Sequence, residues 1–409
     1  MKRNILILLT VLLLAMSMAA CAGPAEVEVG EEPVVEEEPA EEEPAEEEGV
    51  AEEEEAVEEE GAAEGEGALV GQEMPPSIAA IEERKETMVD TSQYRTDPPW
   101  RIAHASQGPT NSWALMYDAH FEWALDQYGD QIEQFLYADA NGSADKQLND
   151  IEDLLAQNPD VLVITPMGRA ALVGPVERAM AEGIPVVLCA SGVDTDNFVT
   201  EIGHNLWELG QNKARWLAEE LGGEGSIFMM SGIAGVDTAE TQKAAALALF
   251  ESEYPNIEIL GDTYGEWSTS TAKRVAESFL VGHPEIDGVF SDGAQMSVGI
   301  IEAFVEAGRE PPPITAEGLN GFLRVADEHD VPFYAESYPN AMGALCADTA
   351  VRVLQGESVP HYIEVAEELD VPVFTNEELG EYYLPECSDD MWVDFIFPRE
   401  VAEELGMCE

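Results

Sequence analysis

From Trp100 onward, short runs rich in β-branched and apolar residues alternate with amphipathic stretches. In the first of these stretches, apolar residues recur at helical spacing, from Trp113 through Phe121 to Tyr128. Strands that alternate with helices form βαβ units, and their parallel sheets carry helices on both faces. The sequence therefore predicts an α/β fold. The expected strands are 101–105, 132–137, 161–164, 185–189, 226–230, 257–260, 287–291, 313–316 and 332–335.

The roughly 310 residues from Trp100 to the C-terminus exceed what one hydrophobic core usually serves, so two domains are expected. In open α/β sheets, a ligand binds beyond the carboxyl ends of the strands. The side chains that follow each strand are therefore the candidates for function.

The chain carries 84 acidic and 18 basic side chains, a formal net charge of −66. A protein that binds nucleic acid by neutralising phosphates needs clustered Lys and Arg, and so does one that docks on anionic lipid. The charge balance excludes both classes. Hydrophobic residues make up 45% of the chain, which is enough for a large core and excludes disorder throughout.

Residues 1–21 have the parts of a secretory signal peptide: a basic start, an apolar run at residues 5–16, and small residues before Cys21. The apolar run is too short to span a membrane as a helix. Residues 18–21, Met-Ala-Ala-Cys, resemble a bacterial lipobox, in which the cysteine is lipidated. An ordinary signal peptide that contains a cysteine is the alternative. We expect an exported protein, lipid-anchored through Cys21 at the extracytoplasmic face of the cell membrane, in the periplasm or at the cell surface.

The segment after Cys21 is a run of glutamate. Residues 22–67 contain 22 Glu and no Asp, Lys or Arg, and such a segment cannot bury apolar surface. We interpret residues 22–97 as an acidic disordered tether that holds the folded part away from the membrane. Calcium binding by the tether is the alternative. One short helix is expected within it, at Ile78–Met88.

Four cysteines remain in the exported chain, and export permits disulfides. Cys387 and Cys408 are the best candidates for a pair, and buried free thiols are the alternative. The other two are Cys189 and Cys346. No CxxC motif is present, so a zinc site built on cysteine is not expected.

The sequence contains no nucleotide-binding glycine motif, no nucleophile elbow and no HExxH motif. Its six histidines are scattered without metal-ligand spacing, and His104, within the first expected strand, is interpreted as structural. Acidic residues are so abundant that a pair of carboxylates alone does not indicate acid–base catalysis. We therefore predict a protein that is not an enzyme and needs no cofactor or metal.

The loops after the expected strands supply aromatic and neutral hydrogen-bonding side chains instead. Trp113 follows Ser106 and Asn111, and Trp267 precedes a run of hydroxyl residues. A sugar needs this mixture, because its apolar faces stack on indole rings while its hydroxyls pair with amides, carboxylates and hydroxyls. The alternative is that either tryptophan is only a core residue.

Several segments between about Trp100 and His361 carry a family resemblance: IAHASQGPTNSW, NPDVLVITPMGRAAL, GIPVVLCASG, GIAGVDTAETQKAA, HPEIDGVFSDGAQMSVGIIEAFVEAG and AESYPNAMGALCADTAVRVLQGE. In their order and spacing they resemble the type I periplasmic sugar-binding proteins, the ribose-binding-protein-like solute receptors of ABC importers. The resemblance implies two Rossmann-like lobes with parallel sheets flanked by helices, joined by a three-stranded hinge, that close over one sugar.

The implied N-terminal lobe comprises residues 98–205 and 338–362, and the implied C-terminal lobe comprises residues 206–337 and 363–375. Residues 376–409 go beyond the family pattern, and we expect them to pack as an added strand or a cover.

The resemblance and the polar loops together place ligand-binding residues after the strands. They are Ser106, Asn111, Trp113, Lys243, Trp267, Asp292, Gln295, Glu317 and Ser337. Ribose-binding relatives carry an Asp-Arg pair where this chain has Ala190-Ser191, and a second-lobe arginine near Thr241 or Lys243. The guanidinium clamp is thus absent or replaced by one ammonium, so ribose itself is not the predicted ligand.

We predict a monomeric receptor that binds a small neutral sugar and delivers it to an ABC permease in the membrane. Two alternatives stay open. One is a receptor that reports a sugar, a nucleoside or a furanosyl autoinducer to a membrane signalling protein. The other is a surface enzyme that acts on glycans. A repressor of the same fold is excluded, because the export signal and the acidic N-terminal region leave no DNA-binding helix pair.

Overall fold

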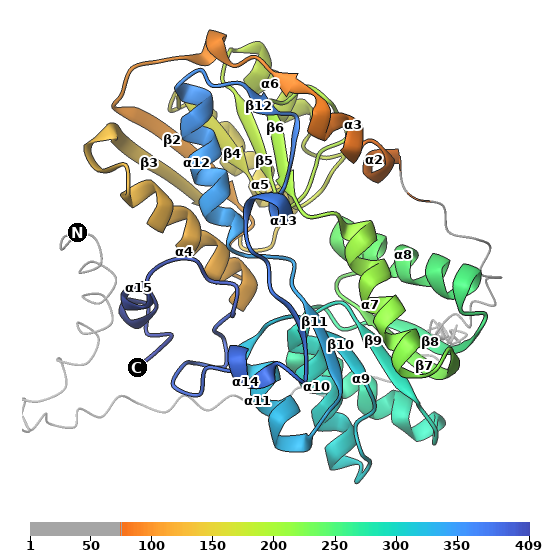
Figure 1. Cartoon of the computed structure of the whole chain (residues 1–409). Coiled ribbons are helices and arrows are strands. Elements are labelled where there is room, and N and C mark those ends of the chain that lie inside the picture. Colours follow the sequence, from red (N-terminus) through yellow and green to blue (C-terminus); the bar gives the residue numbers. More distant parts are fainter. Residues whose placement is uncertain (1–73, 75) are drawn as a thin grey trace, which may run out of the picture. The chain divides into compact units, whose positions relative to one another are not determined.

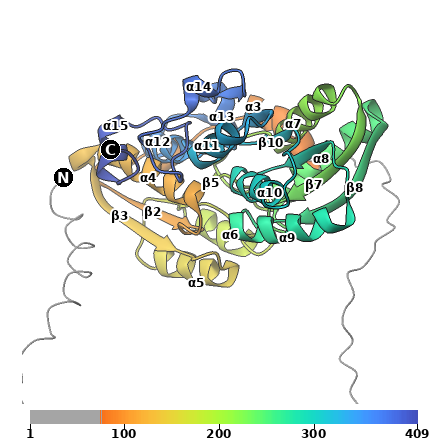
Figure 2. The ribbon, with the colours of Figure 1, turned by 90° about the horizontal axis from the view of Figure 1, so that it is seen from below.

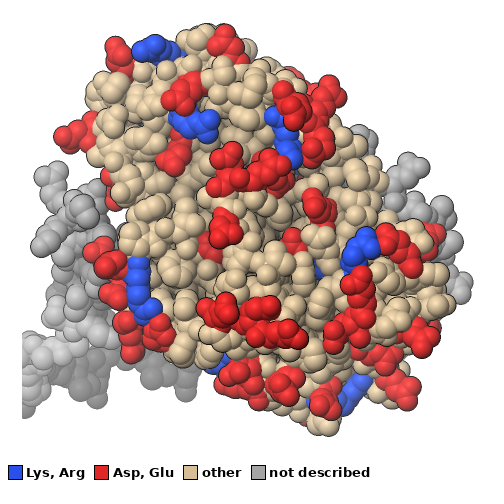
Figure 3. All heavy atoms as spheres, viewed as in Figure 1, with Lys and Arg blue, Asp and Glu red and all other residues tan. Residues whose placement is uncertain are grey.

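The computed structural model describes residue 74 and residues 76–409. The predicted signal peptide, the lipidation site Cys21 and the glutamate run at 22–67 lie outside the described residues. Within the described part, no helix is both long and apolar enough to cross a bilayer. Acidic side chains are spread over the face drawn in Figure 3, with few basic ones among them, and such a surface favours solubility.

An all-parallel sheet in the order β13-β6-β5-β4-β2-β3 forms the N-terminal lobe (Figure 1). Val161 and Val163 of β4 pack on one face with α4 and α12, while Leu162 and Ile164 pack on the other face with α5 and α6. The strands are β2 (Trp100–Ser106), β3 (Ile132–Asp139), β4 (Val161–Ile164), β5 (Val186–Cys189), β6 (Thr200–Gly203) and β13 (Tyr362–Glu364). The helices are α4 (Ser112–Asp126), α5 (Ala144–Leu155), α6 (Val173–Ala181) and α12 (Met342–Leu354).

A second sheet, in the order β14-β11-β10-β9-β7-β8, forms the C-terminal lobe, and only its edge strand β14 runs antiparallel to its neighbour. Phe228 packs with α9, α10 and α11 on one face, and Met229 packs with α7 and α8 on the other. The strands are β7 (Glu224–Ser231), β8 (Asn256–Tyr264), β9 (Gly288–Ser291), β10 (Ile314–Ala316), β11 (Phe333–Glu336) and β14 (Val373–Thr375). The helices are α7 (Leu206–Glu220), α8 (Asp237–Glu253), α9 (Thr269–Gly282), α10 (Ala294–Glu306) and α11 (Asn320–His329).

Three segments join the two lobes. They are residues 204–205 after β6, residues 337–341 after β11, and residues 365–372 after β13, which include the short helix α13 (Val365–Glu368). The predicted α/β fold with two lobes and a three-stranded hinge is confirmed. Strand β13 extends the sheet of the N-terminal lobe to Glu364, two residues beyond the boundary expected at residue 362.

The tether is expected to reach residue 97, and the structure corrects its C-terminal end. Ile81 is only 3% exposed, and the Arg84 guanidinium pairs with Glu201 of β6 and lies over the Tyr362 ring. The chain then forms a short strand that pairs antiparallel with β12, so the residues from Ile81 onward belong to the N-terminal lobe. The elements are α2 (Pro76–Ala79), α3 (Ile81–Glu86), β1 (Met88–Val89), the 3-10 turn η1 (Ser92–Tyr94) and β12 (Val359–Pro360).

Two disulfides tie the described part of the chain. Cys387 pairs with Cys408, the pairing that the sequence favours. Cys189, at the end of β5, pairs with Cys346 of α12, which the sequence analysis did not foresee because 157 residues separate them. Both members of this second disulfide are fully buried, so it links a strand of the N-terminal sheet to the helix that covers it.

Residues 376–409 form a cover with two short helices, α14 (Leu379–Tyr382) and α15 (Arg399–Glu404). Trp392 is 1% exposed and joins the core of the C-terminal lobe. Figures 1 and 2 both place α15 beside α4, a helix of the N-terminal lobe. The cover therefore contacts both lobes.

Candidate functional site

Helix α4 begins at the carboxyl end of β2, where the sequence Asn111-Ser112-Trp113 leaves the loop. The Asn111 side chain accepts a hydrogen bond from the backbone N–H of Ala114 at 2.9 Å, as an N-cap residue does. The Ser112 hydroxyl accepts a hydrogen bond from the amide of Gln295, the second residue of α10, at 3.2 Å. We call the region where the two lobes meet at Ser112 and Gln295 the lobe junction.

Trp113 links the N-terminal lobe to the second hinge segment. Its ring stacks on Tyr117 at a centroid distance of 5.4 Å, and its indole N–H donates to the carbonyl of Tyr338 at 2.7 Å. The backbone N–H of Tyr338 donates in turn to Glu317 at 2.9 Å. Trp113 therefore packs within the N-terminal lobe and also lies at the lobe junction. These contacts combine the packing expected of a core residue with the position expected of a ligand-binding residue.

Trp267 and Asp292 come together at the carboxyl ends of β8 and β9. The Trp267 indole N–H donates to one carboxylate oxygen of Asp292 at 3.0 Å, and the N–H of Gly232 donates to the other at 3.0 Å. A Cβ atom at Gly232 would lie 2.0 Å from the indole, and one at Gly293 would lie 2.5 Å from it. The indole thus lies directly against the backbone of two loops, which only glycine permits.

Two buried carboxyl groups lie near the lobe junction, together with one buried ammonium. Burial raises the pKa of Asp292 to about 7, against the opposing charge of Lys213, and burial also raises the pKa of Glu317. The Lys213 side chain is fully buried, and its ammonium donates to the carbonyl of Asp292 at 3.1 Å and to Gln242 at 3.2 Å. Two carboxyl groups and one ammonium are thus buried together near the lobe junction.

Sequence reasoning missed Lys213. A signal was present, because Lys213 lies four residues after Leu209 and four before Leu217 on the apolar stripe of its helix. A lysine on such a stripe either extends its methylene chain along the apolar surface until the ammonium reaches solvent, or buries the ammonium among hydrogen-bond partners.

The other predicted site residues have partners within one lobe. Ser337 is fully buried, and its hydroxyl accepts from the N–H of Gly318 at 2.9 Å. The Ser106 hydroxyl donates to Asp118 at 3.0 Å, and the Lys243 ammonium donates to the hydroxyl of Tyr264 at 2.8 Å. The structure does not bring Ser106 or Lys243 to the lobe junction through these contacts, and their roles in ligand binding stay predictions.

Arg169, which the sequence analysis did not select as a site residue, forms an ion pair between the two lobes. It follows β4, and its Nη1 atom donates to Asp237 of the other lobe at 3.0 Å while its Nε atom donates to Asp194 at 2.9 Å. A small cavity beside it is lined by residues of both lobes and of α3. These include Arg84, Arg169, Ser191, Glu201, His204 and Asp237. Among the described residues, no group of three or more His, Cys, Asp or Glu side chains is placed to hold a metal ion.

Comparisons with known proteins agree with this architecture. Residues 102–358 match a family described as periplasmic binding protein domain. The ribose import binding protein of Bacillus subtilis is 24% identical over 235 residues, which cover 58% of this chain and 76% of that protein. The xylitol-binding protein of Mycolicibacterium smegmatis is 25% identical over 230 residues, which cover 55% of this chain and 65% of that protein, slightly less than two thirds of its length.

A solved structure has the same fold. The periplasmic binding protein component of the arabinose ABC transporter from Shewanella sp. ANA-3, bound to α- and β-L-arabinofuranose, superposes with a TM-score of 0.62 at 24% identity. The alignment covers 68% of this chain and 93% of that chain. The family match ends at residue 358, so the cover at residues 376–409 lies outside it.

Proposed function

The chain belongs to the periplasmic binding protein family, and on that premise we propose that it is an extracytoplasmic receptor that binds one small neutral sugar between its lobes and delivers it to an ABC permease. The observation that supports the proposal is the hydrogen bond between Gln295 and Ser112, which joins the two lobes beside Trp113 and near the Trp267–Asp292 pair, where strands of both sheets end. This is where open α/β sheets bind ligands.

The chemistry of these groups favours a polyol over a charged ligand. Indole rings stack on the apolar faces of a sugar ring, and the carboxylate of Asp292 and the amide of Gln295 pair with its hydroxyls. An anionic ligand would meet the buried carboxyl groups of Asp292 and Glu317, with Lys213 as the buried cation beside them. The names of the relatives above include ribose, xylitol and arabinofuranose, which are all small and neutral.

Binding in such a receptor is a closure of two lobes, and its free energy comes from ligand contacts made with both of them. The two lobes of this chain already contact each other through Arg169 and Asp237 and through Ser112 and Gln295. A ligand that adds contacts on both sides would favour this closed arrangement. No bond in the sugar needs to be made or broken, so the ligand should be recovered unchanged.

A thermal-shift panel tests the proposal. We expect at least one neutral pentose, hexose or polyol to raise the melting temperature, because a ligand at 100 times its Kd stabilises the folded state by about 2.7 kcal/mol. Glucuronate is the matched control for glucose, since it differs by one carboxylate, and we expect it to give no shift. A panel without any stabilising neutral sugar would contradict the proposal, and a shift by nucleosides alone would favour the signalling alternative.

The location is a separate part of the proposal. The lipobox-like residues 18–21 support lipidation of Cys21, and we propose a monomer held at the extracytoplasmic face of the membrane. Expression of the full chain with Cys21→Ser tests it. We expect the substituted protein to move from the membrane fraction to the soluble fraction with its sugar affinity unchanged, and retention of the protein in the membrane fraction would refute lipid anchoring.

A further inference from the structure

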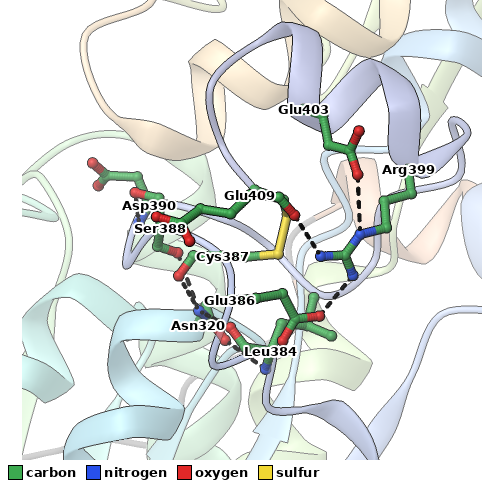
Figure 4. Close-up of a disulfide and its surroundings, with 10 residues drawn as sticks. Asn320, Leu384, Glu386, Cys387, Ser388, Asp390, Arg399, Glu403 and Glu409 are labelled. Atoms are coloured by element: carbon green, nitrogen blue, oxygen red, sulfur yellow. Dashed lines mark hydrogen bonds and ion pairs between the residues drawn. A yellow bond between two sulfur atoms is a disulfide. The ribbon is translucent and has the colours of Figure 1, made fainter.

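The C-terminal segment is closed into a loop by the disulfide between Cys387 and Cys408 (Figure 4). Arg399 of this loop pairs through its guanidinium with Glu403 inside the loop at 3.5 Å and with Glu386, the residue before Cys387, at 2.6 Å. We call residues 387–408 the C-terminal loop. Because the disulfide joins the two ends of this loop, its residues can act together on the parts of the protein that they contact.

One side of the loop is fixed to the C-terminal lobe. The Asn320 amide nitrogen, at the start of α11, lies 2.9 Å from the carbonyl oxygen of Leu384 and 3.1 Å from those of Cys387 and Ser388, so its two protons are shared among these acceptors (Figure 4). The Arg324 guanidinium binds Asp389 through two hydrogen bonds of 2.9 and 2.8 Å. Paired hydrogen bonds between a guanidinium and a carboxylate define both distance and orientation.

The middle of the loop runs along the strand ends at the candidate site. Trp392 forms a backbone bridge with Leu319, and the N–H of Val393 donates to the carbonyl of Gly318 at 2.9 Å. Gly318 and Leu319 directly follow Glu317, one of the predicted ligand-binding residues. The loop therefore lies next to the site and not on a remote surface.

The hydrogen bond from Val393 to Gly318 and the burial of Trp392 hold this middle part against the C-terminal lobe. The next residues leave that lobe. The Asn340 amide, in the second hinge segment, donates to Asp394 at 2.8 Å. From this point the loop contacts the hinge and the N-terminal lobe.

The far side of the loop contacts α4 of the N-terminal lobe through His120. The His120 Nδ1 atom lies 2.7 Å from the carbonyl of Met116, which leaves Nε2 to accept the N–H of Ile396 at 3.2 Å. The Phe397 ring stacks on the imidazole at a centroid distance of 4.4 Å. The C-terminal loop thus contacts the C-terminal lobe on one side and the N-terminal lobe on the other.

Ser112 is the point at which these contacts meet the candidate site. Its hydroxyl oxygen lies 3.2 Å from the indole nitrogen of Trp392 and 3.2 Å from the amide nitrogen of Gln295. A hydroxyl oxygen has two lone pairs, so it can accept both hydrogen bonds. Ser112 lies between Asn111 and Trp113, and the two donors belong to the C-terminal loop and to the C-terminal lobe.

We propose that the C-terminal loop is a clasp and that Trp392 is its positioning residue: the indole N–H fixes the start of α4 against the C-terminal lobe and so sets the closed arrangement in which the sugar is bound. The inference rests on the proposed function for its ligand, but the lobe contacts themselves do not depend on a ligand. Besides the clasp and the hinge, the contacts that join the lobes include the Arg169–Asp237 pair and the Gln295–Ser112 hydrogen bond.

A purely structural loop would stabilise the C-terminal lobe and leave ligand affinity unchanged. Trp392→Phe separates the two roles, because it keeps an aromatic ring in the core and removes the N–H that Ser112 accepts. We expect sugar affinity to fall by about 2- to 10-fold, the range of one hydrogen bond. Ser112→Ala removes this hydrogen bond and also the one from Gln295, so its loss of affinity should be at least as large. The double variant should bind no more weakly than Ser112→Ala, because that substitution already removes the contact with Trp392.

Trp216→Phe is the matched control. Trp216 lies on α7, stacks on Tyr334 within the C-terminal lobe, and has no contact with the clasp or with Ser112 among the described residues. We expect its sugar affinity to equal that of the wild type. If Trp392→Phe and Trp216→Phe bind the sugar equally well, Trp392 does not position the site and the clasp is refuted.

A measurement without ligand tests the clasp independently of the proposed function. Spin labels at Gln131→Cys and Val281→Cys, exposed positions on different lobes, report the distance between the lobes. We expect Trp392→Phe, and also Cys387→Ser combined with Cys408→Ser, to broaden the distribution of distances. An unchanged distribution in Trp392→Phe would refute the clasp. If the distribution broadens but no sugar binds the wild type, the clasp stands and the proposed ligand class fails.

Discussion

Arg169 of the N-terminal lobe and Asp237 of the C-terminal lobe form an ion pair with an N···O distance of 3.0 Å, and Asp194 holds the same guanidinium at 2.9 Å from within its own lobe. The two contacts have different consequences. The bond to Asp194 can persist when the lobes separate, whereas the bond to Asp237 exists only when they are close. The ion pair therefore favours the closed arrangement.

Asp237→Asn should weaken sugar binding, because it removes a charge pair that forms only on closure. The expected loss is about 0.2–1 kcal/mol of binding free energy, since both side chains are partly exposed to solvent. Titration calorimetry at low and high salt measures it, and the difference from the wild type should shrink at high salt. Asp194→Asn is the control with a smaller expected effect; a larger loss in that variant would contradict this account of the pair.

Trp267→Ala should weaken sugar binding by about 1–3 kcal/mol, because the ligand loses a stacking surface and buried contact area. Calorimetric affinity is the measurement. Trp216→Ala provides the control for a tryptophan of the same lobe that lies outside the lobe junction. Equal affinity of Trp267→Ala and the wild type would remove Trp267 from the site.

Gly232→Ala should displace the Trp267 indole, because the new methyl group would lie 2.0 Å from the ring. The expected cost in folding stability is about 1–3 kcal/mol, typical of overpacking, together with weaker sugar binding. Denaturant unfolding and calorimetry measure the two effects. Gly174→Ala on α6 is the control, because a methyl group there would meet no atom within 4 Å. A Gly232→Ala protein with normal stability and affinity would show that the indole position is not critical.

The fold was largely predictable from periodicity, and the exceptions have a common cause. Each of the nine strands expected from apolar runs occurs in the structure. In the sheets of the two lobes, the strands β6, β13 and β14 were missed, because their sequences TEIG, YIE and VFT are too short to stand out from a loop. These three strands acquire their structure from pairing with neighbours in a sheet, which a local pattern does not reveal.

The candidate site was predictable only in part. Asp292 directly follows β9 and Trp267 lies three residues after β8, so the rule that ligands bind at strand ends was sufficient to select them. Arg169 and Lys213 were missed, because long cationic side chains act several ångströms from their own backbone and their partners lie in other elements. Trp392 belongs to a segment outside the family pattern, where the resemblance gave no guide to its position.

Asp394, in the clasp, should make folding stability depend on pH in an identifiable way. Burial raises its pKa to about 7, against a hydrogen bond from Asn340 that lowers it, and the nearby Glu317 raises it further. Between the unfolded value near 4 and about 7, the folded protein therefore binds a proton that the unfolded chain does not. The stabilisation from this proton is fully present below the unfolded pKa and is lost as the pH rises toward 7.

His120, the other titratable group of the clasp contact, acts in the opposite direction. Burial lowers its pKa to about 4, so its contribution to stability is lost as the pH falls from about 6.5 toward 4. A single stability profile of the wild type would therefore mix the two effects. The difference between the wild type and Asp394→Asn isolates Asp394, because His120 is present in both proteins.

Denaturant unfolding of the wild type and of Asp394→Asn at several pH values between 4 and 8 provides the measurement. We expect the stability of the wild type relative to the variant to decrease as the pH rises from 4 to 7, because only the wild type must then keep a proton that the unfolded chain has released or hold a buried carboxylate. His120→Gln is the companion variant, and relative to it the wild type should gain stability over the rise from 4 to 6.5. The contrary result is a difference in folding stability between the wild type and Asp394→Asn that stays constant with pH. The Asp394 carboxyl group would then titrate in the folded protein as it does in the unfolded chain. The buried environment inferred for it within the clasp would be wrong.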